Sequence, residues 1–437
     1  MRDILVTAIV FGSLPFILWR PYVGVLVWTW LAFMNPHRLT WSFAYYMPFA
    51  LVVALATLCG LFFSRAPKKV PWTRETVLLL VFVAWMTITT IFAVYPTLAW
   101  PQLDKVAKII LMVYVTMILM QTRERINQLM WVIALSLAFY GVKGGIFTIV
   151  HGGIYHVRGP AGSFIGGDNE MGLALVMAVP LLRYLQLTTQ RVWLKHLLTA
   201  AMVLTALAAI GSQSRGAFLG IVAMGTFFWL KSRAKLFSAI LAVVAIVSVF
   251  AIMPEQWFER MRTIETYESD DSAAGRINAW KMAINLAKSR PLGGGFDAFQ
   301  PEMFAMYAPE PDNVHDAHSI YFETLGEHGF VGLALFLAIA LLTWRTASSI
   351  IKKTRGDPER RWGADLAAMV QVSLIGYASA GAFLGLAYFD LYYTLVAVII
   401  LCKTVLTIEE RRALAGSSED GRQAAVPARS ALARATS

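Results

Sequence analysis

The sequence predicts an all-α protein that crosses a membrane about twelve times. Its residues are 57% hydrophobic and only 15% charged, and its mean hydropathy is +0.59. Charged residues make up about 25% of an ordinary soluble domain. Apolar runs approach or exceed the ~17 to 25 residues that a helix needs to cross the ~30 Å hydrocarbon layer. We expect helices, because these runs lack the alternating pattern of a membrane β-barrel.

The predicted spans fall on either side of one long polar stretch, residues 254–329. The first apolar run, residues 4–34, is broken at Arg20-Pro21. It is longer than one straight span needs and short for two, so it is either a kinked crossing or a tight hairpin. No small-residue cleavage site follows its apolar core, so we expect no removable signal peptide. The other spans are residues 43–64, 77–94, 105–121, 129–149, 171–189, 197–211, 216–230, 236–253, 330–344, 366–387 and 391–403.

These spans divide the chain into four parts. Residues 1–253 form a first membrane part of about nine spans, 254–329 an outer loop with amphipathic helices, and 330–403 a second membrane part of three spans. The last part, residues 404–437, is a low-complexity tail that we expect to be disordered and cytoplasmic.

The loop charges predict the orientation. Lysines and arginines are concentrated in one alternating set of connections, which the positive-inside rule places in the cytoplasm. The polar stretch then faces the far side, the periplasm of a Gram-negative cell. If the first run crosses once, both termini are cytoplasmic. These loops account for the net charge of +11, so we expect no nucleic-acid partner. Cys59 and Cys402 lie in apolar runs and predict neither a disulfide framework nor a cysteine metal site.

The polar stretch has its own helical pattern. Residues 272–289 begin with Ser272 as a cap and show the 3 and 4 spacing of an amphipathic helix. Arg290-Pro291 ends that helix, and three glycines, residues 293–295, supply a turn. A second helical pattern runs from Asp316 to Gly329, with the glycine as its terminator. The residues on one face of that second helix are predicted to be His318, Tyr321, Phe322 and Leu325.

Three segments carry a resemblance to a known family: GSQSRGAFLG at the end of a span, GRINAWKMAINLAKSRPLGGGFDAF in the outer loop, and AHSIYFETLGEHGFVGL entering the next span. Together they resemble the O-antigen ligases, which are bacterial membrane glycosyltransferases. The sequences of these segments are most similar to the subgroup described as exosortase-associated O-glycosylation ligases. The resemblance implies a helical, lipid-dependent (GT-C-like) fold in the inner membrane, with the active site facing the periplasm. It also implies transfer of a glycan from undecaprenyl diphosphate to an acceptor, in the best-known case the lipid A-core of lipopolysaccharide.

The resemblance assigns roles to three residues. Arg215 and Arg276 match the family's arginines, and a planar guanidinium suits bidentate contact with a diphosphate. His318 matches the motif histidine, which takes or orients the acceptor proton. Ser319 follows it, where the wider family often has asparagine. The implied reaction is inverting and needs neither ATP nor a cofactor or metal.

Further contacts are predicted around this core. Arg158, in the glycine-rich loop 151–172, is a third candidate for the diphosphate or an anionic core sugar. The candidate substrate contacts are Gln213, Ser214, Asn169 and Tyr321.

Plainer interpretations stay open for each of these residues. Arg215 is equally suited to anchoring a span at the membrane interface, and Arg276 to the solvated face of its helix. His315 and His328 are rivals of His318 for the catalytic role, and His315, Asp316 and His318 are weak evidence for a metal site. Asp168 or Asn169 could cap the next helix.

Other functions also stay open. An O-antigen polymerase, or a ligase that glycosylates protein, would use the same donor chemistry with another acceptor. A transporter or flippase would show internal repeats, which we do not find, and a non-catalytic scaffold would not need His318.

Overall fold

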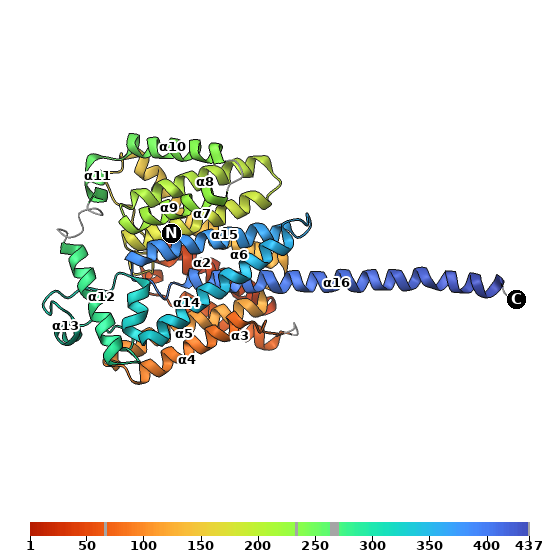
Figure 1. The fold of residues 1–437 in the computed structure, drawn as a ribbon, viewed down its shortest axis with the longest axis horizontal. Helices are drawn as coiled ribbons and strands as arrows, with labels where there is room; N and C mark the ends of the chain where they lie inside the picture. The colour runs from red at the N-terminus through yellow and green to blue at the C-terminus, as the bar shows by residue number, and fades with distance from the viewer. Residues whose placement is uncertain (65–67, 232–234, 263–270, 436–437) are drawn as a thin grey trace.

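The described structure is entirely helical. The computed structural model covers residues 1–64, 68–231, 235–262 and 271–435, and no strand occurs among them (Figure 1). The helices before the outer loop are α1 (Arg2–Trp19), α2 (Pro21–Met34), η1 (Pro36–Leu39), η2 (Phe43–Tyr45), α3 (Phe49–Phe63), α4 (Arg74–Ile91), α5 (Pro96–Leu119), α6 (Arg123–Val150), α7 (Asp168–Thr188), α8 (Val192–Gly211), α9 (Arg215–Lys231) and α10 (Lys235–Ile252). The later helices are α11 (Glu255–Arg262), α12 (Asp271–Ser289), α13 (Pro301–Tyr307), α14 (Ile320–Thr354), α15 (Arg361–Ala380), η4 (Gly381–Phe383) and α16 (Asp390–Ala435).

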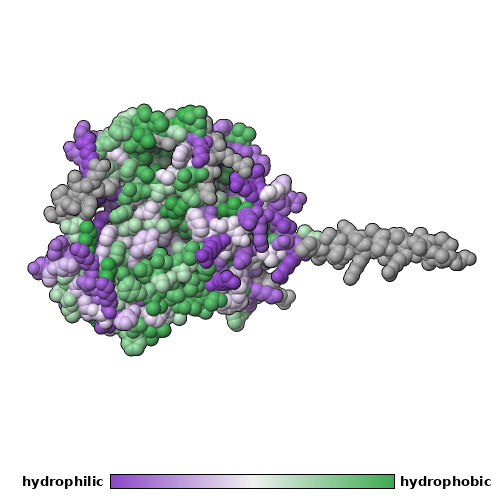
Figure 2. Space-filling model, in the orientation of Figure 1, coloured by the Kyte–Doolittle hydropathy of each residue, from purple (hydrophilic) through white to green (hydrophobic). Residues whose placement is uncertain are grey.

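The helices are those of a multi-pass membrane protein. Eight helices among the described residues are long and apolar enough to cross a membrane, and three apolar helices are shorter. Figure 2 shows hydrophobic surface along the helix bundle and hydrophilic side chains gathered towards its two ends. Each span predicted after the first run overlaps one α-helix, although the spans 43–64 and 366–387 also include the short helices η2 and η4. The number of crossings and the location of the outer loop stay predictions. Helix α16 continues through the predicted tail to Ala435.

The first apolar run is a hairpin. Arg20 separates two helices that pack together, and Pro21 begins the second at a position where no backbone N–H is needed. The guanidinium of Arg2 donates to the carbonyl of Leu39 over 3.4 Å, and the N–H of Ser42 donates to Asp3 over 3.0 Å. The start of α1 therefore lies beside the segment that follows α2. The alternative of one kinked crossing is wrong, and with it the condition for placing both termini in the cytoplasm.

Reporter fusions would test the predicted orientation. We expect a reporter joined after Leu292 to behave as external and one joined after Arg355 as cytoplasmic, because of the cation asymmetry between the loops. An amino-terminal reporter should behave as external, because the hairpin returns the chain to its starting side. Alkaline phosphatase, active only after export, and a protein that fluoresces only in the cytoplasm give opposite readouts. The reverse pattern would overturn the placement of the outer loop.

Helix α14 is divided by a glycine. Gly329 has φ 66° and ψ −171°, and a Cβ at this position would lie 2.1 Å from the carbonyl oxygen of Pro291. Only glycine fits both the backbone angle and the space. The predicted break at Gly329 is therefore present, although the helix resumes after it. The predicted start at Asp316 is wrong, because α14 begins at Ile320.

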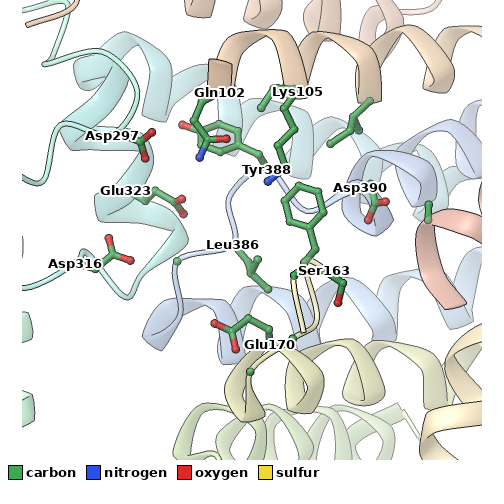
Figure 3. Close-up of a pocket in the computed structure, with 18 of the residues that line it drawn as sticks. Gln102, Lys105, Ser163, Glu170, Asp297, Asp316, Glu323, Leu386, Tyr388 and Asp390 are labelled. Carbon is green, nitrogen blue, oxygen red and sulfur yellow. The ribbon is translucent and has the colours of Figure 1, made fainter. Parts of the chain in front are cut away.

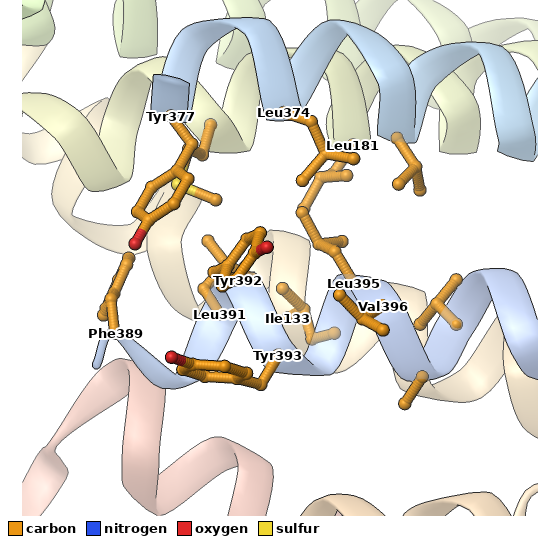
Figure 4. Close-up of a cluster of buried hydrophobic side chains, with 14 of the residues drawn as sticks. Ile133, Leu181, Leu374, Tyr377, Phe389, Leu391, Tyr392, Tyr393, Leu395 and Val396 are labelled. Atoms are coloured by element: carbon orange, nitrogen blue, oxygen red, sulfur yellow. The ribbon is translucent and has the colours of Figure 1, made fainter. Parts of the chain in front are cut away.

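Buried tyrosines hold the segment between α15 and α16. The rings of Tyr377 and Tyr392 stack with centroids 4.7 Å apart (Figure 4). The hydroxyl of Tyr377 donates to the carbonyl of Leu386 over 2.8 Å, and that of Tyr393 donates to Ala387 over 3.0 Å. Aromatic burial and hydrogen bonding together order residues 384–389, which reach the site described next.

Candidate functional site

Helix α12 is the platform for the segment that carries His318. The side-chain amide of Asn278 donates to the carbonyls of Glu310 and Asn313 over 2.8 and 2.9 Å. The indole N–H of Trp280 donates to the carbonyl of Ala317 over 2.8 Å. The helix predicted at residues 272–289 is present as α12, although it begins at Asp271, before the predicted cap Ser272. The structure adds that Asn278 and Trp280 of this helix hold residues 310–317.

The platform also makes room for a histidine. A Cβ at Gly275 would lie 2.2 Å from Cδ2 of His315, so any larger residue here would displace that ring. Further along α12, the ring of Trp280 stacks on Phe322 of α14 at 4.8 Å and 11°. The segment of residues 310–318, called the motif segment below, is therefore held at both ends, by packing against α12 and by the start of α14.

His318 is half-buried next to Arg276, His315 and Asp316. It precedes α14 and has a left-handed backbone with φ 42°, so the prediction that it shares a helix face with Tyr321, Phe322 and Leu325 is wrong. Burial lowers the pKa of His318 below its ordinary value, and Arg276 and His315 lower it further, whereas Asp316 opposes them. The imidazole is therefore kept neutral at physiological pH, the state in which it can accept a proton.

The two rival histidines have different surroundings. His328 is 0% exposed, its Nδ1 lies 2.7 Å from the hydroxyl of Thr89, and its carbonyl accepts from the indole of Trp85. It joins α14 to α4 inside the bundle and is inaccessible to a substrate. His315 is more accessible and lines the cavity described below.

The SQSRG motif forms the start of α9. The backbone N–H of Ala217 donates to Ser214 Oγ over 3.2 Å, which caps the helix, and Arg215 is its first residue. Gln213 has φ 56°, and its amide donates to the carbonyls of Gly153 and Ile154. Ser214 and Gln213 are both buried and therefore position Arg215 and the neighbouring loop; their contact with substrate stays a prediction.

The start of α9 and α12 flank the same short helix, η4. A Cβ at Gly216 would lie 3.0 Å from the carbonyl of Ala380 and 3.6 Å from Cβ of Phe383. The ring of Phe383 is 6.5 Å from that of Trp280. The start of α9, where Arg215 lies, and the turn of α12 that follows Arg276 thus both lie beside η4.

The glycine-rich loop lies beside them. The N–H of Val157 donates to the carbonyl of Gly211 over 3.0 Å, and His156 lies 2.7 Å from Asp168. Arg158 is exposed, and Asn169 is half-buried in the first turn of α7, where its N–H donates to Asp168. The structure brings this loop to the α9 motif but leaves the roles of Arg158 and Asn169 as predictions.

Tyr321 marks the top of an apolar groove. Its hydroxyl donates to the carbonyl of Ala378 over 2.8 Å, which ties α14 to α15. The groove between these helices has a volume of about 430 Å³ and continues past Phe336 and Leu341 to Trp344. Its lining begins at Ile320, two residues after His318, and suits a hydrocarbon chain.

A larger, polar cavity of about 910 Å³ opens at the same end (Figure 3). Its wall combines residues from α2, α5, α7, α14 and the segment before α16, and includes His315 and Asp316 of the motif segment. None of the eight predicted site residues belongs to the described wall, although Glu170 directly follows Asn169. The residues that sequence reasoning did not assign to a site are Lys105, Asp297, Glu323, Glu327, Tyr388 and Asp390. Most of these residues could have been noticed in the sequence as ionisable side chains within or at the ends of apolar helices, which are typical of functional sites.

Hydrogen bonds hold two of these carboxylates. Glu327 accepts from the hydroxyl of Tyr388 over 2.5 Å and from the N–H of Asp297 over 2.8 Å. Glu323 accepts from the N–H of Ala387 over 2.9 Å. The cavity wall is therefore built by α14 holding both the outer loop and the segment before α16. Among the described residues, no group of three His, Cys, Asp or Glu side chains is arranged to hold a metal ion.

These features define a multi-pass membrane protein that offers polar groups to a substrate at one end of its bundle. Comparison with known families identifies it more narrowly. Residues 200–337 match the family described as O-antigen ligase, and residues 1–189 match a family of unknown function, DUF5935. The match over residues 200–337 supports assignment of this part of the chain to the O-antigen ligase family. The matched segment contains Arg215, Arg276 and His318, and no curated protein matches the chain.

Proposed function

We propose that this protein transfers a glycan from undecaprenyl diphosphate to a sugar hydroxyl, as an O-antigen ligase at the periplasmic face of the inner membrane. The observation that carries the proposal is the neutral His318 beside Arg276, within a segment that matches the O-antigen ligase family. The acceptor proposed is the lipid A-core of lipopolysaccharide. The similarity to exosortase-associated O-glycosylation ligases belongs to the same proposal.

The proposed reaction is a single displacement. The acceptor oxygen attacks the anomeric carbon, the new C–O bond forms, and the bond from that carbon to the diphosphate oxygen breaks. Undecaprenyl diphosphate leaves with the electron pair, and His318 takes the proton of the acceptor hydroxyl. Arg215 and Arg276 stabilise the negative charge that grows on the leaving group. No nucleotide is consumed, because the diphosphate is already a good leaving group.

The apolar groove between α14 and α15 fits the lipid part of this donor. It begins at Ile320, close in sequence to His318, and its lining from Phe336 to Trp344 is hydrocarbon and aromatic. A polyprenyl chain in this groove would bring the diphosphate to the end of the bundle where α12 and the start of α9 meet η4. The polar cavity, which is lined by His315 and Asp316, is then available to the acceptor.

Purified protein in detergent or vesicles would test the function. Incubation with undecaprenyl-diphosphate glycan and a lipid A-core acceptor should yield the glycosylated acceptor and free undecaprenyl diphosphate. Growth of the donor glycan without a separate acceptor would indicate a polymerase instead. Absence of transfer to any offered sugar or protein, together with absence of donor binding, would refute the proposal.

Removing divalent cations should leave transfer intact. Because two guanidinium groups can neutralise the diphosphate, the reaction needs no bridging metal. The measurement is the rate of product formation in a chelator, compared with the rate after added magnesium. A rate that vanished with the chelator and returned with magnesium would contradict this and direct attention to Asp271 and to Asp270, which lies outside the described residues.

A further inference from the structure

The wall of the polar cavity is rich in carboxyl groups. The carboxylates of its wall are Glu170, Asp297, Asp316, Glu323, Glu327 and Asp390. The only lysine or arginine side chains in the described wall are Lys105 and Arg38. The histidines of the described wall are His37 and His315. Burial and the neighbouring Arg38 lower the pKa of His37 to about 4, so His37 carries no charge at neutral pH. Burial raises the pKa of Asp297, and nearby Asp316 raises it further, so these carboxyl groups already disfavour one another's charge. An anionic group entering the cavity would add to this repulsion.

The two cationic side chains each make a cation–π contact with an aromatic ring. The ammonium of Lys105 lies 3.8 Å from the ring centre of Phe164, and the guanidinium of Arg38 lies 4.7 Å from that of Tyr45. Within the described residues, Lys105 forms no ion pair with a carboxylate. Lys105 moderates the repulsion among the carboxylates, and in the view of Figure 3 it lies between Asp297 on one side and Asp390 on the other.

The side chain of Asp390 leaves a hydrogen-bond acceptor without a partner in the cavity wall. Its side chain lines the cavity and the residue is only 4% exposed, yet its Oδ1 has no hydrogen-bond partner among the described residues. A buried carboxylate oxygen left without a donor is costly, so a ligand that supplies one would be stabilised here. This observation is independent of the number of carboxylates in the wall.

The shape and the other side chains favour a carbohydrate. The volume of about 910 Å³ accommodates a short oligosaccharide. Trp28, Phe164 and Phe299 contribute aromatic surface that can pack against sugar rings, and Gln102 adds an amide. Carboxylates accept strong hydrogen bonds from hydroxyl and ammonium groups.

Resting on the proposed function, we infer that this cavity binds the acceptor as a saccharide whose groups around the reacting hydroxyl are hydroxyls or amines, and not phosphates or carboxylates. His315 and Asp316 belong to its wall, and His318 follows two residues after Asp316, so a sugar in the cavity would present a hydroxyl towards the base. A lipid A-core satisfies this requirement only through sugars that are free of acidic substituents.

Acceptor competition would test the inference. Purified full-length protein is given undecaprenyl-diphosphate glycan and three oligosaccharides of one length: with hydroxyls only, with one amine, or with one phosphate next to the accepting residue. We expect the first two to be used and the phosphorylated one to have a KM at least ten-fold higher, the effect of one unfavourable charged contact. Equal use of the phosphorylated acceptor would overturn the inference while leaving the proposed function standing.

Two variants distinguish an effect on acceptor binding from an effect on folding. Asp390→Asn and Glu170→Gln should each raise the KM for the hydroxyl or amine acceptor by about ten-fold, because a charge-assisted hydrogen bond is weakened, with donor binding unchanged. Glu170 is only half-buried, so its variant answers the question even if Asp390→Asn fails to fold. Asp312→Asn is the matched control, because Asp312 is exposed and outside the described wall. Unchanged acceptor KM in the folded variants would refute the inference; loss of donor binding and transfer in the wild type would instead refute the proposed function.

Discussion

Replacing His318 is expected to abolish transfer while leaving donor binding largely intact. Loss of a general base costs about 10² to 10⁴ in rate, and the diphosphate would still be held by the arginines. Because His318 has φ 42°, alanine adds backbone strain, so His318→Asn is the better variant: asparagine tolerates this conformation but is no base. Product formation and binding of radiolabelled donor are measured on the same preparations.

The matched control is His151→Ala, because His151 is exposed in the glycine-rich loop and should be dispensable. His315→Ala should have a smaller effect on the rate than either His318 variant. His328→Ala should affect stability rather than the chemical step, because its ring lies in the bundle beside Thr89. Near-normal transfer by His318→Asn would exclude His318 as the base.

The pH dependence follows from the same residue. Only neutral imidazole can take the proton, so activity is present above the pKa of His318 and is lost as pH falls through it. Burial lowers that pKa, so the acid limb of the rate profile should lie below about 6.5, the ordinary value for histidine. The product should have an inverted anomeric centre, which NMR of the new linkage would establish. A retained configuration would contradict single displacement.

Arg215→Lys and Arg276→Lys are each expected to lose about 10² to 10³ in rate, because lysine keeps the charge but cannot form the two parallel contacts of a guanidinium. Both proteins should insert and fold. Arg262→Lys is the matched control, since Arg262 is an exposed arginine at the end of α11. Transfer rates at saturating donor give the result, and wild-type rates in both variants would reduce these arginines to interface anchors.

Sequence reasoning found what depends on local pattern. The apolar runs predicted the membrane helices, the 3 and 4 spacing predicted α12, and Gly329 was recognised as a break. It could not choose between a hairpin and a kinked crossing for residues 4–34, because the contacts of Arg2 and Asp3 with residues 39–44 are long-range. The sequence pattern also predicted a helix at His318. Its periodicity does not indicate that α12 holds residues 310–317, so that His318 lies before the start of α14.

The cavity was missed for a related reason. Lys105, Glu323 and Asp390 lie on three helices far apart in the chain, and each looks like an isolated charge at the end of an apolar run. Only packing brings them together. The motif residues could be matched one by one, whereas the acidic wall is a property of five elements at once.

The cavity wall draws on both matched families. Gln102, Lys105 and Glu170 lie within residues 1–189, whereas Asp297 and Glu323 lie within the O-antigen ligase segment that also holds His318. Substitutions in the first segment can therefore reshape the cavity without disturbing the arginines or the histidine. Recombination between relatives at the α7–α8 connection would exchange one side of the cavity, together with Arg158, while keeping Arg215, Arg276 and His318 in one piece. Such an exchange would alter acceptor selectivity separately from the proposed transfer step.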